Sequence, residues 1–303
     1  MNKSILHIGY PKTASSWFQT CFYPKVRNVK YYEREIVQKL IISTYEFDFQ
    51  KDFVQNNFVS EKTSIICEET LVGTISTGGF RGSFTSSIAK RLHKLFPNAK
   101  VVIFIRRQPD IIASAYLQYI RGGGTKSINA YLGKNVNLGV VQGLSLFTFK
   151  FLEYHRSIEL YKSIFGEEKI LVYMYEDLFK NRGNFIKCFC DDLELDIDVD
   201  KVNWQFKNQK FRQFLIPLVR LSNCFTRRNN LNKYYLFHIP GWFYLSQRIF
   251  TALNRLKIFG SSPNSKSVLG RKNFEYILDY YKESNRILKE KHLIDVEKNG
   301  YSV

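Results

Sequence analysis

The stretch ILHIGYPKTASSWFQ, residues 5–19, decides the expected fold of this chain. Its first four residues predict a short buried strand, and residues 9–13 form a tight turn with one glycine and one proline. An apolar-periodic segment with helix spacing then opens at Ala14. A strand, a small-residue loop and a helix start together aim backbone N–H groups and the positive end of a helix dipole at an anion.

The side chains of this loop predict the kind of anion that it binds. Lys12 lies inside the loop, and the hydroxyl groups of Thr13, Ser15 and Ser16 flank it, which indicates a phosphate group. The loop differs from the nucleotide pattern G-x-x-x-x-G-K-[ST], because its lysine precedes the small residues and the second glycine is missing. A lysine at such a turn is more often a solvated loop residue, so the prediction depends on a second motif.

A second strand–helix junction supplies that motif. Residues 100–105 read KVVIFI, a continuous apolar run typical of a strand inside a parallel sheet. The run leads into Arg106, Arg107 and then a predicted helix that carries Ser114. A buried parallel strand delivers its last residue to the edge at which open α/β sheets bind ligands. Arg106 and Ser114 are therefore expected to meet there. The forked guanidinium group of the arginine and the hydroxyl group of the serine would then bind the same phosphate.

Strand and helix patterns alternate along the first two thirds of the chain, which predicts βαβ units and a parallel, three-layer α/β fold. Further strands are expected at 64–67 and 169–174, and helices at 33–45, 88–96, 109–121 and 146–165. Residues 73–87 are rich in Gly, Ser and Thr and predict a mobile loop, with a lid over a site as one use. Beyond residue 200 the pattern is helical, closing with a helix over 274–290. We expect one domain over 1–303, with an α/β core of 1–200 and a basic, mainly helical extension of 201–303.

The composition indicates a globular, strongly basic protein. Hydrophobic residues make up 45% of the chain and the formal net charge is +18. The last third, from Lys201 onward, holds 19 basic and 6 acidic residues and so carries +13 of that charge. Such a surface attracts nucleic acid, anionic lipid headgroups, an acidic glycan or a multiply charged cofactor.

Other patterns bear on location and partners. No apolar run of about 18 residues and no signal peptide is present, so we expect a cytoplasmic protein, with a position peripheral to the inner membrane as the alternative. Residues 237–256 have an amphipathic period beside basic residues and fit a membrane surface, a core helix or a homodimer interface. The cysteines lack metal-type spacing, which predicts buried free thiols and no metal site. They are Cys21, Cys67, Cys188, Cys190 and Cys224.

The loop PKTASSW resembles the 5′-phosphosulfate-binding loop of sulfotransferases, which use 3′-phosphoadenosine 5′-phosphosulfate (PAPS) and usually read P-K-[ST]-G-T-T-[WLT]. Ala14 stands where many members have glycine, so it must adopt a negative φ or tolerate mild strain. The resemblance implies a P-loop-like α/β/α fold with a central parallel sheet and a helical C-terminal third. It also implies PAPS as donor, 3′,5′-ADP as product and no metal. The implied donor contacts at this loop come from Lys12, Thr13, Ala14, Ser15, Ser16 and Trp17.

The second junction is similar to the 3′-phosphate motif of the same family, an arginine that ends a strand and a serine eight residues later. That spacing favours Arg106 over Arg107 as the partner of Ser114. The late segment SKSVLGRKNF resembles the basic loop of carbohydrate sulfotransferases, which implies that Lys266 and Arg271 help to hold the 3′-phosphate. The alternative interpretation, that Lys266 and Arg271 are exposed charges on a loop, is equally well supported by the sequence. The whole chain looks most like bacterial members that act on a hydroxyl group of a glycan or glycolipid.

Sulfuryl transfer depends mainly on positioning and on charge stabilisation, as phosphoryl transfer does. Lys12 is expected to neutralise charge on the leaving oxygen, and a general base must take the acceptor proton. Members of the family that act on carbohydrates commonly use a glutamate. Glu69 is the favoured base, because its context E-T-L-V-G resembles bacterial relatives, and Glu68 and Glu33 are the alternatives.

Two other functions stay open from the sequence. A P-loop-type nucleotide-dependent kinase would share the fold, but neither G-K-[ST] nor a strand-ending aspartate paired with it for magnesium is present. A nucleic-acid-binding or anionic-surface-binding protein would explain the net charge of +18, although no base-stacking or groove-reading motif appears, so no nucleic-acid partner is expected.

Overall fold

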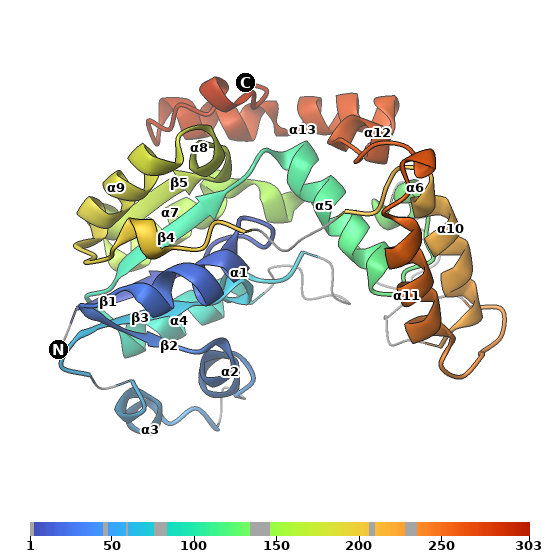
Figure 1. Cartoon of the computed structure of the whole chain (residues 1–303). Coiled ribbons are helices and arrows are strands. Elements are labelled where there is room, and N and C mark those ends of the chain that lie inside the picture. The colour runs from blue at the N-terminus through green and yellow to red at the C-terminus, as the bar shows by residue number, and fades with distance from the viewer. Residues whose placement is uncertain are drawn as a thin grey trace.

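The computed structural model describes residues 3–44, 48–58, 60–75, 84–133, 146–205, 210–227 and 235–303. Within these ranges five strands form one parallel sheet in the order β2-β3-β1-β4-β5 (Figure 1). They are β1 (Ser4–His7), β2 (Val29–Tyr32), β3 (Thr63–Cys67), β4 (Lys100–Ile105) and β5 (Ile170–Met174). The chain builds the sheet on one side of β1 and then on the other, so the carboxyl ends of β1 and β4 flank the point at which strand order reverses. Open α/β sheets bind ligands at such a point.

Alternation along the central strands builds a hydrophobic core on each face of the sheet. In β4, Val101, Ile103 and Ile105 join the larger core cluster, whereas Val102 and Phe104 join the smaller one. The larger cluster receives side chains from α4 (Thr85–Leu95), α5 (Gln108–Arg121), α7 (Tyr154–Phe165) and α13 (Arg271–Glu290). The smaller cluster is covered by α1 (Ser15–Trp17), its π-helical continuation η1 (Phe18–Phe22) and α9 (Arg182–Leu193). The predicted three-layer α/β arrangement is confirmed.

The remaining helices are short or belong to the last third. They are α2 (Arg34–Val37), α3 (Lys51–Asn56), α6 (Ile128–Tyr131), α8 (Tyr175–Lys180), α10 (Leu215–Ser222), α11 (Trp242–Leu253) and α12 (Ser265–Leu269). The described residues beyond 200 contain helices and no strand, as expected for a helical C-terminal third. In Figure 1, α10 and α11 lie at the flank of the molecule, beyond α5 and away from the sheet.

Three expectations from the sequence need correction. The strand β2 was not predicted, because it is an edge strand whose central residues Lys30 and Tyr31 are not buried. The helix expected over 146–165 begins only at Tyr154, and the carbonyl of Phe149 before it accepts a hydrogen bond from the Tyr281 hydroxyl instead. All five cysteines are free thiols, but of the five only Cys67 is buried: Cys188 is exposed, and Cys21, Cys190 and Cys224 are half-buried. Residues 76–83 of the expected lid lie outside the described ranges.

Candidate functional site

The loop between β1 and α1 has a backbone shape suited to an anion. Lys12 and Ala14 both have a φ of 70°, in the left-handed region that residues with a side chain seldom adopt. Left-handed residues that alternate with others turn successive N–H groups toward one concave point, which is an anion-binding arrangement. The sequence left either a negative φ or a strained, positive φ open for Ala14, and the structure has the positive one. Strain of this kind persists only where surrounding contacts hold it, and it gathers at functional sites.

Two hydrogen bonds hold the loop in this shape. The Thr13 hydroxyl donates to the carbonyl of Tyr10 at 2.5 Å, and the Arg106 guanidinium donates to the carbonyl of Lys12 at 2.8 Å. Tyr10 is itself fully buried and donates to the Ser157 hydroxyl at 2.8 Å, so the loop rests on a fixed base. The helix start follows directly, and its first N–H groups have no acceptor within the helix.

A pocket of about 360 Å³ opens beside this loop, at the carboxyl ends of the strands. Lys12 and Ala14 reach it from the loop after β1, Arg106 from the end of β4, and Ser114 from α5. The other lining residues are Leu117, Gln118, Arg121, Tyr175, Phe179, Lys210 and Phe211. Across the whole lining four side chains are cationic, those of Lys12, Arg106, Arg121 and Lys210, and none of the described residues that line the pocket is acidic. The two predicted phosphate motifs, about a hundred residues apart in sequence, thus meet in one basic pocket.

Arg106 is the residue that joins the two motifs. Its guanidinium donates to the Lys12 carbonyl and stacks over the Tyr175 ring at 4.2 Å, while Nε has no acceptor among the described residues. That N–H group is buried, and a buried donor without a partner is costly, so a bound anion would satisfy it. Arg107 instead pairs with Asp110 at 2.7 Å. The pocket therefore contains Arg106, the arginine that the spacing to Ser114 favoured.

The electrostatics of the pocket favour an anion. Burial lowers the pKa of Lys12, the nearby Glu69 carboxylate opposes that shift, and the Arg106 and Arg121 guanidinium groups lower the pKa further. Burial and Arg106 likewise lower the pKa of Lys210. Cations that depress one another's protonation in this way are stabilised when a negative group arrives between them.

The three candidate glutamates occupy different surroundings. Glu69 accepts a hydrogen bond from the Ser15 hydroxyl, which places it against the start of α1, directly after the Lys12 loop. Glu68 is fully buried, paired with Arg34 at 2.6 Å and bonded to the amide and hydroxyl of Thr70. Glu33 is exposed at the start of α2 and lines a different depression, beside β2.

Some predicted contacts lie away from the pocket. The Trp17 side chain is buried, where it stacks on Trp204 with ring centroids 4.9 Å apart, and its backbone N–H donates to Ala14. Lys266 and Arg271 are exposed near the start of α12 and α13 and are not part of the lining, and Arg271 pairs with Glu275 at 2.7 Å. Thr13 of the loop and Ser15 and Ser16 of α1 are also outside the lining. The roles of all of these residues stay predictions.

The pocket also contains residues that the sequence did not point to. Arg121 lies seven residues after Ser114 on α5, and that two-turn spacing puts both on one helix face, which was a usable signal. Tyr175 follows β5 directly, at the same edge of the sheet as Arg106. Lys210 comes from a segment before α10 that shows no local pattern, so only the tertiary structure brings it in.

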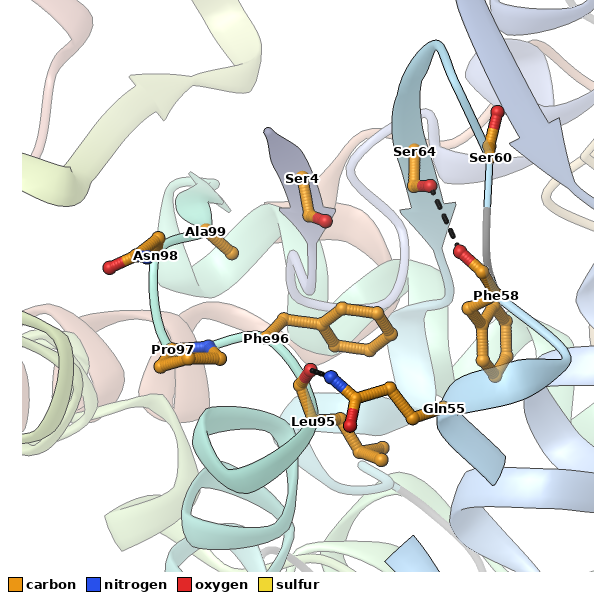
Figure 2. Close-up of a pocket in the computed structure, with 10 residues that line it drawn as sticks. All are labelled: Ser4, Gln55, Phe58, Ser60, Ser64, Leu95, Phe96, Pro97, Asn98 and Ala99. Atoms are coloured by element: carbon orange, nitrogen blue, oxygen red, sulfur yellow. Dashed lines mark hydrogen bonds between the residues drawn. The ribbon is translucent and has the colours of Figure 1, made fainter. Parts of the chain in front are cut away.

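A second pocket, of about 210 Å³, lies at the opposite, amino end of the strands (Figure 2). Ser4 from β1 and Ser64 from β3 reach it, together with the turn that precedes β4. Figure 2 shows the hydrogen bonds from Ser64 to the Phe58 carbonyl and from Gln55 to the Leu95 carbonyl. None of its described lining residues is charged, so it offers no counterpart to the basic pocket.

Two further features concern metals and membranes. The described residues contain no group of three or more His, Cys, Asp or Glu side chains that could hold a metal ion. Among the same residues, no helix combines the length and the apolar character needed to cross a bilayer.

Comparisons with known proteins bear on the fold. No protein-family model and no curated protein matches the sequence. A solved sulfotransferase from Alicyclobacillus acidocaldarius is similar with a TM-score of 0.50 and 14% identity, covering 86% of this chain and 99% of that one. A mouse sulfotransferase complexed with PAP has a TM-score of 0.45 and 12% identity, covering 94% of this chain and 84% of that one. The first likeness shows that this chain has the P-loop-like α/β fold of a sulfotransferase.

Proposed function

We propose that the protein is a PAPS-dependent sulfotransferase, which moves a sulfuryl group to an acceptor hydroxyl and leaves 3′,5′-ADP. The observation that carries the proposal is the basic pocket. It joins the strained Lys12 loop to Arg106 and Ser114, and four cations line it without a carboxylate among the described lining residues. A donor with a phosphosulfate at one end and a 3′-phosphate at the other has the charge that such a pocket requires.

The chain's own residues have distinct tasks in this proposal. The donor supplies an activated sulfuryl group, so the protein needs to position the reactants and stabilise charge. Loop N–H groups and Lys12 hold the phosphosulfate end, and the Lys12 ammonium neutralises charge on the leaving oxygen. The Ser114 hydroxyl and Arg106, whose Nε–H has no acceptor among the described residues, hold the 3′-phosphate.

Glu69 is the general base that we propose. It is bonded to Ser15 at the start of α1 and is close enough to Lys12 to influence the protonation of the lysine. A base in that position lies near the sulfuryl group on which the acceptor oxygen must converge. Glu68 is less suited, because Arg34 and Thr70 already occupy both of its oxygens. Glu33 belongs to another depression.

The acceptor that we propose is a hydroxyl group of a glycan or glycolipid. It rests on the resemblance of the segment around Lys266 and Arg271 to carbohydrate sulfotransferases. Those residues are exposed and lie outside the pocket, so this part of the proposal stands apart from the donor site.

Calorimetry with 3′,5′-ADP and with ATP tests the function. We expect tight binding of 3′,5′-ADP and much weaker binding of ATP, which lacks the 3′-phosphate that Arg106 and Ser114 would hold. Transfer of a labelled sulfuryl group from PAPS should continue in EDTA. Preferred binding of ATP, with activity that EDTA abolishes and magnesium restores, would replace the proposal with a kinase.

A further inference from the structure

The segment between Asp200 and Glu275 has an unusual charge composition. Residues 201–274 include 14 lysines and arginines and neither aspartate nor glutamate. This segment contains α10, α11 and α12. Its positive charge therefore has no counter-charge within the segment, and such a surface attracts an anionic partner.

The helix α11 exposes the apolar residues that a globular protein usually buries. All twelve residues of α11, WFYLSQRIFTAL, are described, and Ser246 alone is buried. Tyr244 is 70% exposed, and Leu245 and Ile249, one turn apart, are 52% and 42% exposed. The core covers only one side of α11, because Phe250 and Leu253 pack against it half-buried while Tyr244, Leu245 and Ile249 stay exposed.

The neighbouring segments continue the same surface. In and before α10, Leu215 and Val219 pack into the core while Phe214, Leu218 and Leu221 lie outward with i, i+4, i+7 spacing. We call residues 210–227 and 235–258 the arm. Large hydrophobic side chains are exposed all along it: Phe214, Leu218, Leu221, Tyr235, Leu236, Phe237, Ile239, Tyr244, Leu245, Ile249, Leu256 and Ile258. Monomeric proteins seldom present so many without a partner.

The arm is firmly attached to the body of the protein. The Asn223 amide, which is buried, donates to the carbonyls of Ile120 and Gly124 at 2.8 Å each, where α5 ends. The loop before α11 is bonded in turn to the helical turn η9 (Asn223–Phe225) that follows α10, through the N–H groups of Leu236 and Ile239, which donate to the carbonyls of Cys224 and Phe225. Figure 1 shows α10 and α11 together at the flank of the molecule. The apolar surface is thus carried on an ordered platform.

We propose that the arm is a docking surface for a membrane that contains anionic lipids. Leucine, isoleucine and aromatic side chains enter the boundary between headgroups and acyl chains, and arginine and lysine pair with the lipid phosphates. Exposed cations in the described residues of the arm are Lys210, at its start, and Arg227, Arg248, Arg255 and Lys257 among the apolar residues.

The charge composition favours a bilayer over two other occupants. A second copy of this chain would bring the same acid-free segment against itself, and like charges that face each other oppose association. A nucleic acid would satisfy the cations but would leave the leucines and isoleucines in water. A bilayer with anionic headgroups satisfies both kinds of side chain at once.

Docking would also position the candidate site. Lys210 and Phe211, at the start of the arm, line the basic pocket, so a docked arm holds that pocket near the lipid surface. This consequence rests on the proposed function, in which case the acceptors within reach would be lipid-linked.

Flotation of the full chain with lipid vesicles tests the proposal. We expect binding to vesicles of phosphatidylcholine mixed with phosphatidylglycerol, and much weaker binding to phosphatidylcholine alone or at high salt. The double variant Leu245→Asp, Ile249→Asp should lower the partition coefficient about tenfold or more. The matched control is Ile36→Asp, Phe53→Asp on α2 and α3, whose side chains are 40% and 60% exposed, and it should bind vesicles as the natural chain does. Arg248→Gln with Arg255→Gln should remove much of the preference for anionic lipid, and Lys51→Gln with Lys94→Gln should not.

Four results would overturn the proposal: no vesicle binding, an equal loss in the Ile36 and Phe53 control, a dimer in ultracentrifugation that the Leu245 and Ile249 variant dissociates, or binding to DNA in place of vesicles. Calorimetry with 3′,5′-ADP separates the two proposals, because the arm variants should bind the nucleotide normally. A chain that floats with vesicles and fails to bind 3′,5′-ADP contradicts the proposed function and leaves membrane docking intact.

Discussion

The two ends of the parallel sheet both carry a pocket, and the two linings differ in kind. At the carboxyl end, four cations surround a loop that contains two left-handed residues, Lys12 and Ala14. At the amino end, serine, amide and phenylalanine side chains line a smaller and uncharged space (Figure 2). The cations of the carboxyl-end lining all come from residues outside the strands, whereas two strand residues, Ser4 of β1 and Ser64 of β3, reach the amino-end pocket. In this fold, chemistry is concentrated in the segments that leave the sheet.

The largest expected effect is on turnover, and it should be confined to the carboxyl end. Lys12→Ala removes the cation that we propose for charge neutralisation at the leaving oxygen, and Glu69→Gln removes the proposed proton acceptor while keeping its size. Each should lower the rate of sulfuryl transfer by about 10²- to 10⁴-fold. Ser64→Ala, in the amino-end pocket, should leave the rate unchanged. Steady-state rates at saturating substrates provide the measurement.

The choice of base has its own possible contradiction. The assignment would be wrong if Glu69→Gln keeps near-normal turnover while Glu33→Gln or Glu68→Gln is folded but inactive. The residue whose variant is inactive would then be the base. The donor site would be unaffected by that result.

The next effect is the dependence of folding stability on pH. His7 ends β1 and is buried against Phe104 at a ring distance of 4.9 Å, and this burial lowers its pKa to about 3 from the ordinary histidine value of 6.5. Below pH 6.5 the unfolded chain binds a proton at this histidine and the folded chain does not, so stability falls as the pH drops below that value. The loss should be about 1.4 kcal/mol per pH unit.

Urea unfolding of the natural chain and of His7→Phe, each at pH 6.5 and 4.5, measures this contribution. His7→Phe leaves the Tyr23 hydroxyl without its partner and is expected to be less stable at both values, so the comparison is between the two pH dependences. The variant should lose about 2 to 3 kcal/mol less over this interval. Identical pH dependences would show that His7 is not held neutral by the fold.

A similar or smaller effect is expected on nucleotide affinity. Arg106→Ala should weaken 3′,5′-ADP binding by about 1.5–3 kcal/mol, because a charge-assisted contact is lost. Ser114→Ala should cost about 0.5–1.5 kcal/mol, as a single neutral hydrogen bond does. Arg107→Ala, whose side chain pairs with Asp110, is the control at the same junction and should change affinity least. Calorimetric affinities that are equal for all three variants would remove the basis for the 3′-phosphate site.

The smallest effect is on strain. Ala14→Gly should stabilise the fold by about 0.5–1 kcal/mol, because glycine adopts a φ of 70° without a steric penalty and this gain exceeds the cost of its greater freedom when unfolded. Ala115→Gly, the same substitution inside α5, should destabilise by about 1 kcal/mol. Thermal unfolding shows whether each substitution raises or lowers the stability of the protein. Destabilisation by Ala14→Gly would mean that the loop is not strained.

These contrasts also explain what the sequence could predict. Lys12, Arg106 and Ser114 lie next to strong strand signals, and the order of parallel strands brings such junctions to one edge of the sheet. Lys210 reaches the pocket through the packing of the helical third, which no local spacing encodes. Lys266 and Arg271 carry a family-like pattern, but in this structure they are turned to solvent. The edge strand β2 was missed for a related reason, because its alternation is broken by a lysine and by a half-buried tyrosine.

The hydrogen bond from Arg106 to the carbonyl of Lys12 has a kinetic consequence. It fixes the guanidinium before any ligand arrives, so little side-chain freedom remains to be lost when a nucleotide binds. A preorganised binding site of this kind affects mainly the dissociation rate of the ligand rather than its association rate. The residence time of the nucleotide, more than its association rate, should therefore depend on how firmly this one arginine ties the two halves of the site together.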